Sequence, residues 1–216
     1  MTEQNFEQMR RAMVASSLRT TGVNDPRVLA AIGAVPRERY VPRARAAMAY
    51  ADNPVPLGNG RELNSPLALG RMLSEAQPAP HERTLVIAAA SGYAAAVMER
   101  LAGSVVALEE ESDLAAVARD NLAGSSVELV EGPLVQGHAP GAPYDFILID
   151  GAVEFIPEEI IGQLVDGGRL AAAILDNGVA RISLGRRAGE GFGIAPITDR
   201  ASAILPSFVR PRAFTF

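Results

Sequence analysis

The sequence contains no cysteine, only two histidines and no long apolar run. Without cysteine, the chain can form neither a disulfide bond nor a thiolate metal site. His81 and His138 lie far apart in the sequence, which argues against a zinc site built on paired histidines and against a histidine-based catalytic triad. We therefore expect no metal site.

The chain also lacks the sequence features of membrane and nucleic-acid-binding proteins. No apolar run is long enough to span a bilayer, and the opening stretch "MTEQNFEQMRRAM" mixes charged and apolar residues without a secretory core. The 20 basic residues are outnumbered by 25 acidic ones, and the net charge of −5 opposes binding through a broad basic face. These features predict a cytoplasmic protein that binds neither nucleic acid nor a membrane.

The length of 216 residues suits one large domain or a domain with an appendage. Before residue 60, apolar spacing predicts a helix ending near Gly22 and a second helix capped by Asp25 with Pro26 at its first position. The stretch "AYADNPVPLGNG" has the composition of a loop, and "NSPLALGRMLSEA" predicts another helix. We divide the chain into an N-terminal helical extension, residues 1–60, and a main domain, residues 61–216.

Strand and helix patterns alternate in the main domain. Helical segments such as "YAAAVMERLAG" and "SDLAAVARDNLAG" separate the apolar strands "RTLVIAA", "SVVALE", "SVELVEG", "YDFILIDGA" and "GGRLAAAIL". This alternation predicts an α/β fold with a mostly parallel sheet and helices on both faces. The tail around "RRAGEG" lacks a helical period and predicts an antiparallel pair at the end of the sheet.

The ends of three predicted strands favour an adenosine-type cofactor, because ligands of open α/β sheets bind outside the carboxyl ends of the strands. The first is the turn "AAASGY", residues 88–93. Glu109 follows about 20 residues later, the spacing of an acid that binds the ribose hydroxyls. The third is "VEGPL", residues 130–134. The alternatives are a tightly packed strand–helix corner and, for Glu109, a surface charge beside Glu110 and Glu111.

The sequence resembles the protein-L-isoaspartate (D-aspartate) O-methyltransferases almost from end to end. The resemblance rests on "RVLAAIGAVPRERYVP", "AYADNPVPLGNG", "SGYAAAVMERLAGSVVALE" and "APYDFILIDGAVEFIPEEIIGQLVDGGRL". It implies a Rossmann-like seven-stranded methyltransferase sheet with helices on both faces and an N-terminal helical extension. It also implies S-adenosylmethionine as cofactor, methyl transfer to the α-carboxyl of isoaspartyl residues for protein repair, and isoaspartyl proteins or peptides as partners of a monomer or homodimer.

The cofactor turn departs from the family pattern. The family carries glycines at the positions of Ala88 and Ala90 and an acid at Val86, whereas Ser91, Gly92 and Tyr93 match. An alanine forced to positive φ costs roughly 1–2 kcal/mol, and its methyl group fills space beside the cofactor.

Further departures affect the adenine and substrate positions. Pro133 replaces the family's adenine-binding aspartate, which leaves stacking and the backbone of Leu134. Asn64 stands at the position of the catalytic serine and is followed by Ser65; both residues could instead cap the helix that starts at Pro66.

Asp150 stands where the family carries a small neutral residue. Its carboxylate could repel a carboxylate substrate, hold an amine-bearing ligand, or be satisfied by the following turn.

Three hypotheses follow from these motifs. The chain is a working isoaspartyl methyltransferase, a non-catalytic binding or dimerising relative, or a methyltransferase for another substrate. The candidate catalytic residues are Asn64 and Ser65. The candidate cofactor-binding residues are Ala88, Ala90, Ser91, Gly92, Tyr93, Glu109, Pro133, Leu134 and Asp150.

Overall fold

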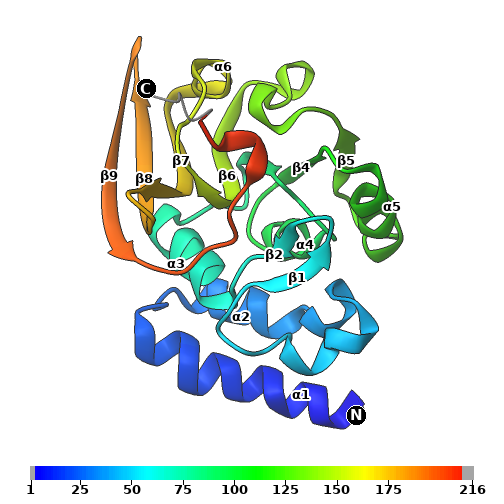
Figure 1. Cartoon of the computed structure of the whole chain (residues 1–216). Coiled ribbons are helices and arrows are strands. Elements are labelled where there is room, and N and C mark those ends of the chain that lie inside the picture. Colours follow the sequence, from blue (N-terminus) through cyan, green and yellow to red (C-terminus); the bar gives the residue numbers. More distant parts are fainter. Residues whose placement is uncertain (1–2, 211–216) are drawn as a thin grey trace, which may run out of the picture.

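The computed structural model describes residues 3–210 and is built around a seven-stranded sheet (Figure 1). The strand order is β5-β4-β3-β6-β7-β8-β9. Pairing from β5 to β7 is parallel, and β7, β8 and β9 pair antiparallel. The strands are β3 (Arg83–Ile87), β4 (Ser104–Glu109), β5 (Glu128–Glu131), β6 (Tyr144–Val153), β7 (Leu164–Asp176), β8 (Val179–Ala188) and β9 (Gly191–Asp199). The predicted seven-stranded α/β fold is confirmed, and so is the antiparallel pair at its end.

Alternating side chains of the parallel strands supply two separate hydrophobic cores. In β3, Val86 belongs to one buried cluster, whereas Leu85 and Ile87 belong to the other. This period of two places an apolar layer on each face of the sheet, as a sheet covered on both sides requires.

Helices cover both faces of this sheet. The helices are α1 (Glu3–Ala12), α2 (Pro26–Ala34), α3 (Pro66–Ala76), α4 (Tyr93–Met98), α5 (Ser112–Asn121) and α6 (Glu158–Ile161). A π-helical turn, η1 (Met13–Leu18), continues α1, and the 3₁₀ turns are η2 (Arg19–Thr21), η3 (Arg37–Tyr40), η4 (Arg43–Met48), η5 (Leu134–Gln136), η6 (Ala139–Gly141) and η7 (Pro206–Phe208). The first core contains residues of α2, α3, α4 and α5, and the second contains residues of η5, α6 and η7.

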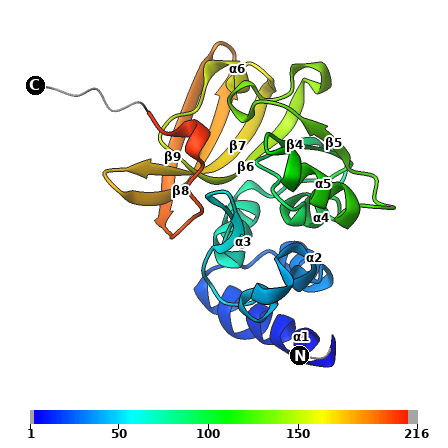
Figure 2. The same cartoon turned by 45° about the vertical axis from the view of Figure 1, so that its right-hand side comes forward.

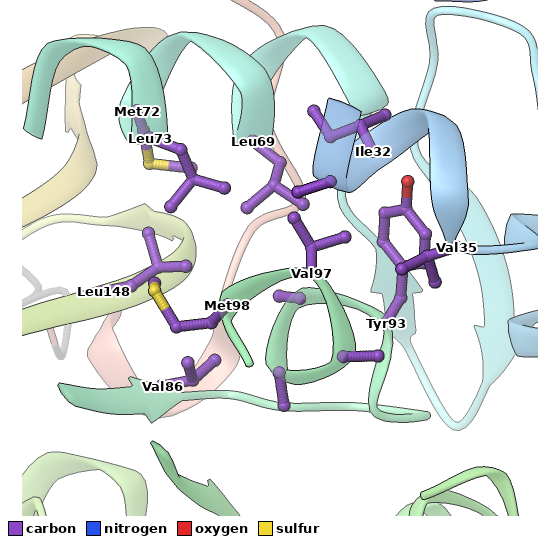
Figure 3. Packing of buried hydrophobic residues seen from close by; sticks show 14 of the residues in the cluster. Ile32, Val35, Leu69, Met72, Leu73, Val86, Tyr93, Val97, Met98 and Leu148 are labelled. Carbon is purple, nitrogen blue, oxygen red and sulfur yellow. The ribbon is translucent and has the colours of Figure 1, made fainter. Parts of the chain in front are cut away.

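The core beneath α3 and α4 is dense and apolar (Figure 3). Leu69, Met72 and Leu73 of α3 point toward Val97 and Met98 of α4, all of them nearly or fully buried. Each such side chain contributes roughly 1.5–3 kcal/mol when fully buried. The packing fixes α4, and with it the turn that precedes α4.

The N-terminal helices belong to this same core. Asp25 caps α2 by accepting a hydrogen bond from the backbone N–H of Arg27, with Pro26 at the first helical position, as the sequence predicts. Figure 2 shows α1 and α2 beyond α3 and α4, away from α6. The predicted division after residue 60 stays a prediction, and residues on both sides of it share one buried cluster.

A two-stranded hairpin, β1 (Val55–Gly58) and β2 (Arg61–Leu63), replaces part of the predicted loop before α3. Its turn is Asn59-Gly60, and both residues have positive φ, 49° and 76°. An Asn-Gly pair is the preferred sequence for a tight hairpin turn, because both central residues tolerate this conformation. The loop prediction was therefore wrong over β1, and β2 begins directly after the predicted loop.

Within residues 3–210, no helix combines the length and the apolar character needed to cross a membrane. The same residues contain no cluster of three or more acidic, histidine or cysteine side chains that could hold a metal ion.

Candidate cofactor and substrate site

Glu109 ends β4 and is completely buried. Its Oε2 accepts a hydrogen bond from the backbone N–H of Ala90 at 2.6 Å. Its Oε1 accepts from the N–H groups of Glu110 and Glu111, both at 3.0 Å. The side chain thus turns back toward the loop that follows β3, which is where the sequence places a cofactor-binding acid.

The guanidinium group of Arg61 occupies the remaining side of this carboxylate. Nη1 lies 2.6 Å from Oε1 of Glu109, and Nη2 lies 3.0 Å from Oε2. The Arg61 side chain is only 2% exposed, so the pair is a buried, two-pronged ion pair. Sequence reasoning missed Arg61; the Asn59-Gly60 turn could have revealed it, because the hairpin carries the next residue toward the sheet.

The turn after β3 adopts the backbone conformation that the missing glycines would favour. Ala88 has φ 64° and Ala90 has φ 51°, and both side chains are buried. Each left-handed alanine costs roughly 1–2 kcal/mol relative to an ordinary conformation. Gly92 has φ 96°, and a Cβ there would lie 3.1 Å from the side chain of Leu122. The turn therefore has the left-handed backbone that glycines would allow, and it carries two methyl groups that glycines would lack.

Ser91 and Tyr93 connect this turn to the N-terminal segment. The hydroxyl of Ser91 donates to the backbone carbonyl of Tyr40 at 2.5 Å. Tyr93 starts α4, and its ring stacks edge-on against that of Tyr40 with centroids 5.4 Å apart. Burial raises the pKa of Tyr93 to about 12, so its phenol is neutral at physiological pH. Both side chains point into packing contacts rather than into an open cleft.

Arg37 is fully buried, and its side chain contacts three segments, those of Ala49, Asn64 and Tyr93. Its Nε donates to the carbonyl of Ala49 at 2.7 Å, and Nη2 donates to the carbonyl of Asn64 at 2.5 Å. The guanidinium carbon lies 4.6 Å from the centre of the Tyr93 ring, within range of a cation–π interaction. Burial lowers the pKa of Arg37, an effect that Tyr93 and Asp150 oppose electrostatically.

Asn64 and Asp150 form a second buried polar contact. Nδ2 of Asn64 donates to Oδ1 of Asp150 at 2.9 Å. The Asn64 Oδ1 accepts hydrogen bonds from the hydroxyl of Ser202 at 2.9 Å and from the backbone N–H groups of Ser65 and Ala203 at 2.9 and 3.2 Å. Burial raises the pKa of Asp150 to about 6, and the Asn64 hydrogen bond opposes that shift.

Ser65 caps α3. Its Oγ accepts a hydrogen bond from the N–H of Ala68 at 3.0 Å, and Pro66 follows at the first helical position. The sequence allowed Ser65 to act as a helix cap, and the structure shows this cap. A catalytic role for Ser65 stays a prediction.

Pro133 and Leu134 follow the end of β5. Leu134 is fully buried in the second core, whereas Pro133 lines an open pocket of about 1240 Å³ together with Leu108 and Phe155. The residues lining this pocket include neither Glu109 nor any residue of the turn at 88–93. Pro133 is thus the one predicted cofactor-binding residue that lines this pocket, and the others lie outside it.

Comparison with known proteins identifies the family. The sequence model described as protein-L-isoaspartate(D-aspartate) O-methyltransferase matches residues 9–196. The chain belongs to this family. A protein-L-isoaspartate O-methyltransferase of Methanoregula boonei is 42% identical over 168 residues, covering 76% of this chain and 77% of that protein. A relative of the same name from Methanoculleus marisnigri is 40% identical over 168 residues, covering 76% of each chain.

Solved structures confirm the fold. One protein-L-isoaspartate O-methyltransferase aligns with a TM-score of 0.77 at 22% identity, covering 91% of this chain and 65% of its own. A second, from Plasmodium falciparum in complex with S-adenosyl-L-homocysteine, aligns with a TM-score of 0.74 at 18% identity, covering 94% and 98%. The family match over residues 9–196 and the relatives of 40–42% identity confirm the predicted family, with its methyltransferase function and its cofactor, S-adenosylmethionine. The site residues of this chain stay predictions.

The residues of this chain do not fit the family's cofactor in the arrangement described. The two oxygens of Glu109 already accept five hydrogen bonds, more than their four lone pairs favour, which leaves no acceptor for a ribose hydroxyl pair. Ala88 and Ala90 add methyl groups at the turn, and Pro133 offers no side-chain acceptor to adenine. A cofactor would have to displace at least one of the groups now bound to Glu109.

Proposed function

We propose that this chain is a protein-L-isoaspartate O-methyltransferase whose described conformation is closed. The observation that supports the proposal is the position of Glu109 at the end of β4, held by the backbone of the turn after β3. An acid at this place is what binding of an adenosyl cofactor requires. The match to the family over residues 9–196 supports the same function.

The α-carboxyl of an isoaspartyl residue is the proposed methyl acceptor, and Asp150 with Asn64 would face it. Burial raises the pKa of Asp150 to about 6, which makes this carboxyl easier to neutralise than an exposed one. A neutral Asp150 would not repel a carboxylate substrate. Because Asn64 donates to Asp150, its role here is to position that group rather than to attack a substrate.

Two measurements test the proposal. Isothermal titration with S-adenosylmethionine tests cofactor binding, and transfer of a labelled methyl group to an L-isoaspartyl peptide tests the reaction. The matched control is the same peptide with normal L-aspartate, which should accept no label. Cofactor binding without methylation of the isoaspartyl peptide would contradict the proposed substrate and favour a methyltransferase with another acceptor.

The second candidate is a non-catalytic family member that acts as a binding or dimerising protein. Its specific support is the combination of the Arg61–Glu109 pair with left-handed Ala88 and Ala90. The variant Ala88→Gly/Ala90→Gly tests the contribution of the methyl groups. If they crowd the ligand, this variant should bind S-adenosylmethionine more tightly than the wild-type chain does; unchanged binding would show that they are not the obstacle.

We further propose isoaspartyl-containing proteins as partners, action in the cytoplasm, and a monomeric or homodimeric state. The net charge of −5 supports a protein that does not depend on nucleic acid. Light scattering after size-exclusion chromatography measures the oligomeric state.

A further inference from the structure

We propose that the segment after Arg210, residues 211–216, docks into the open pocket beside Pro133. This pocket is the space of about 1240 Å³ described above, and Val209 is part of its lining. Its occupant is thus a segment of the same chain, and the docking does not depend on the proposed function.

The pocket presents an apolar surface at the edge of the second core. Val130, Val135 and Ala142 line the pocket, are only partly buried and pack against that core. Phe155 also lines the pocket, and its ring contacts that of the buried Phe208 with centroids 6.0 Å apart. Apolar side chains gathered in one open pocket are typical of a binding surface, whereas single exposed apolar side chains are not.

The sequence of residues 211–216 suits this surface. It is "PRAFTF", and it contains two of the seven phenylalanines of the chain, Phe214 and Phe216. A phenylalanine ring gains free energy when it moves from water into an apolar pocket.

The segment also starts in the right place. Val209, which lines the pocket, is 40% exposed, so the described part of the chain ends beside the pocket. Phe214 follows five residues later. Five extended residues span roughly 17 Å, more than the roughly 11 Å across a compact space of 1240 Å³.

Charge distinguishes this pocket from a second groove beside the end of the described chain, which we call the Arg210 groove. The lining of the pocket within residues 3–210 includes Glu131 and Glu159 and no arginine or lysine. Glu131 already pairs with Arg119, which leaves Glu159 to attract Arg212 of the segment. The Arg210 groove carries two acidic and two basic side chains, Glu154, Asp176, Arg181 and Arg210. The pocket therefore suits a basic segment better than the groove does.

Disulfide trapping tests the docking, because the chain has no cysteine and an engineered pair is the only one that can form. Val135→Cys/Phe214→Cys places one thiol in the pocket and the other on the segment. The matched control, Ile194→Cys/Phe214→Cys, places the first thiol in the Arg210 groove, where Ile194 is 40% exposed. Under mild oxidation at micromolar protein, the Val135 pair should form the disulfide within one chain about tenfold faster than the control pair. Each rate is normalised to the reaction of the single thiols with a small disulfide reagent.

The cross-linked products decide the outcome. Equal rates for the two pairs, or faster trapping in the Arg210 groove, would overturn the docking. A disulfide between two chains would also overturn it, because the occupant would then be a second copy. Non-reducing electrophoresis separates this product from the disulfide within one chain.

Arg212→Glu in the Val135→Cys/Phe214→Cys background tests the charge argument. It should slow trapping about threefold at low salt, because it replaces attraction to Glu159 by repulsion, and high salt should remove the difference. Arg212→Lys keeps the charge and should be trapped at the parent rate. Equal rates for the Glu and Lys variants would contradict the docking, since the acidic lining is what favours this pocket.

A measurement without cysteine excludes trapping of a rare encounter. Phe214→Ala/Phe216→Ala removes both rings, and amide hydrogens of residues 134–142 should then exchange about threefold faster than in wild type. Exchange in α1 should stay the same, and unchanged exchange at 134–142 would overturn the docking. Neither measurement uses methyl transfer, so a chain that docks the segment but does not methylate isoaspartyl peptide would contradict the proposed function alone.

Discussion

Replacing Glu109 by glutamine should destabilise this protein severely, because the buried Arg61 guanidinium would lose its counter-charge. A carboxamide has one acceptor oxygen, whereas Glu109 accepts from five donors. The better orientation keeps the three donors on the Oε1 side and leaves the new amide NH₂ facing Nη2 of Arg61 and the N–H of Ala90. Breaking a buried ion pair in this way costs roughly 3–5 kcal/mol.

Thermal unfolding followed by circular dichroism measures this loss. For a chain of this size, each kcal/mol lowers the melting temperature by roughly 2–4 °C, so Glu109→Gln should melt roughly 6–20 °C below wild type. Glu131→Gln is the matched control: Glu131 pairs with Arg119 at 2.7 Å on the surface, and its loss should leave the melting temperature unchanged.

A double variant identifies the source of the loss. Arg61→Met/Glu109→Gln removes both charges and should recover part of the stability that Glu109→Gln loses, because no unpaired charge remains in the core. A fall of less than about 3 °C for Glu109→Gln, or no recovery in the double variant, would refute the assignment of a buried ion pair that stabilises the strand end.

Three further changes test other parts of the site. Burial raises the pKa of Asp150 to about 6 from 3.8, so the stability of wild type relative to Asp150→Asn should fall by about 2 kcal/mol as the pH rises from 4 to 7; urea unfolding at each pH checks this, and a constant difference contradicts it. Ser65→Ala should lower the free energy of unfolding by about 1 kcal/mol and Ser65→Thr, which keeps the capping hydroxyl, should lower it less, if capping of α3 is what the side chain contributes. Arg37→Lys should lose about 2 kcal/mol in the same assay, because a single ammonium cannot reach the carbonyls of both Ala49 and Asn64; equal stability would mean that one of these contacts is dispensable.

The strands and helices could be predicted because short stretches of the sequence are enough to indicate them. The apolar run Leu85, Val86 and Ile87 indicates a strand covered on both faces, and Pro26 after Asp25 indicates the start of a helix. The family resemblance then supplied the seven-stranded architecture. Each of these signals occupies a few consecutive residues, so it can be interpreted without knowledge of the rest of the chain.

The partners within the site could not be predicted in the same way. Arg61 is 48 residues from Glu109, and no period of the sequence connects them. Asn64 likewise meets Asp150 across 86 residues. Glu109 was located correctly at the strand end, but which group its carboxylate binds depends on how the hairpin packs against the sheet.

The buried cluster that joins α2 to α3 and α4 also determines how the protein should respond to truncation. Ile32 and Val35 cover α4 from the N-terminal side, so a fragment that starts at residue 61 would present that apolar surface to water. We expect such a fragment to aggregate instead of folding as an independent sheet. The whole chain should correspondingly unfold in one cooperative transition, with the N-terminal helices and the sheet losing structure together.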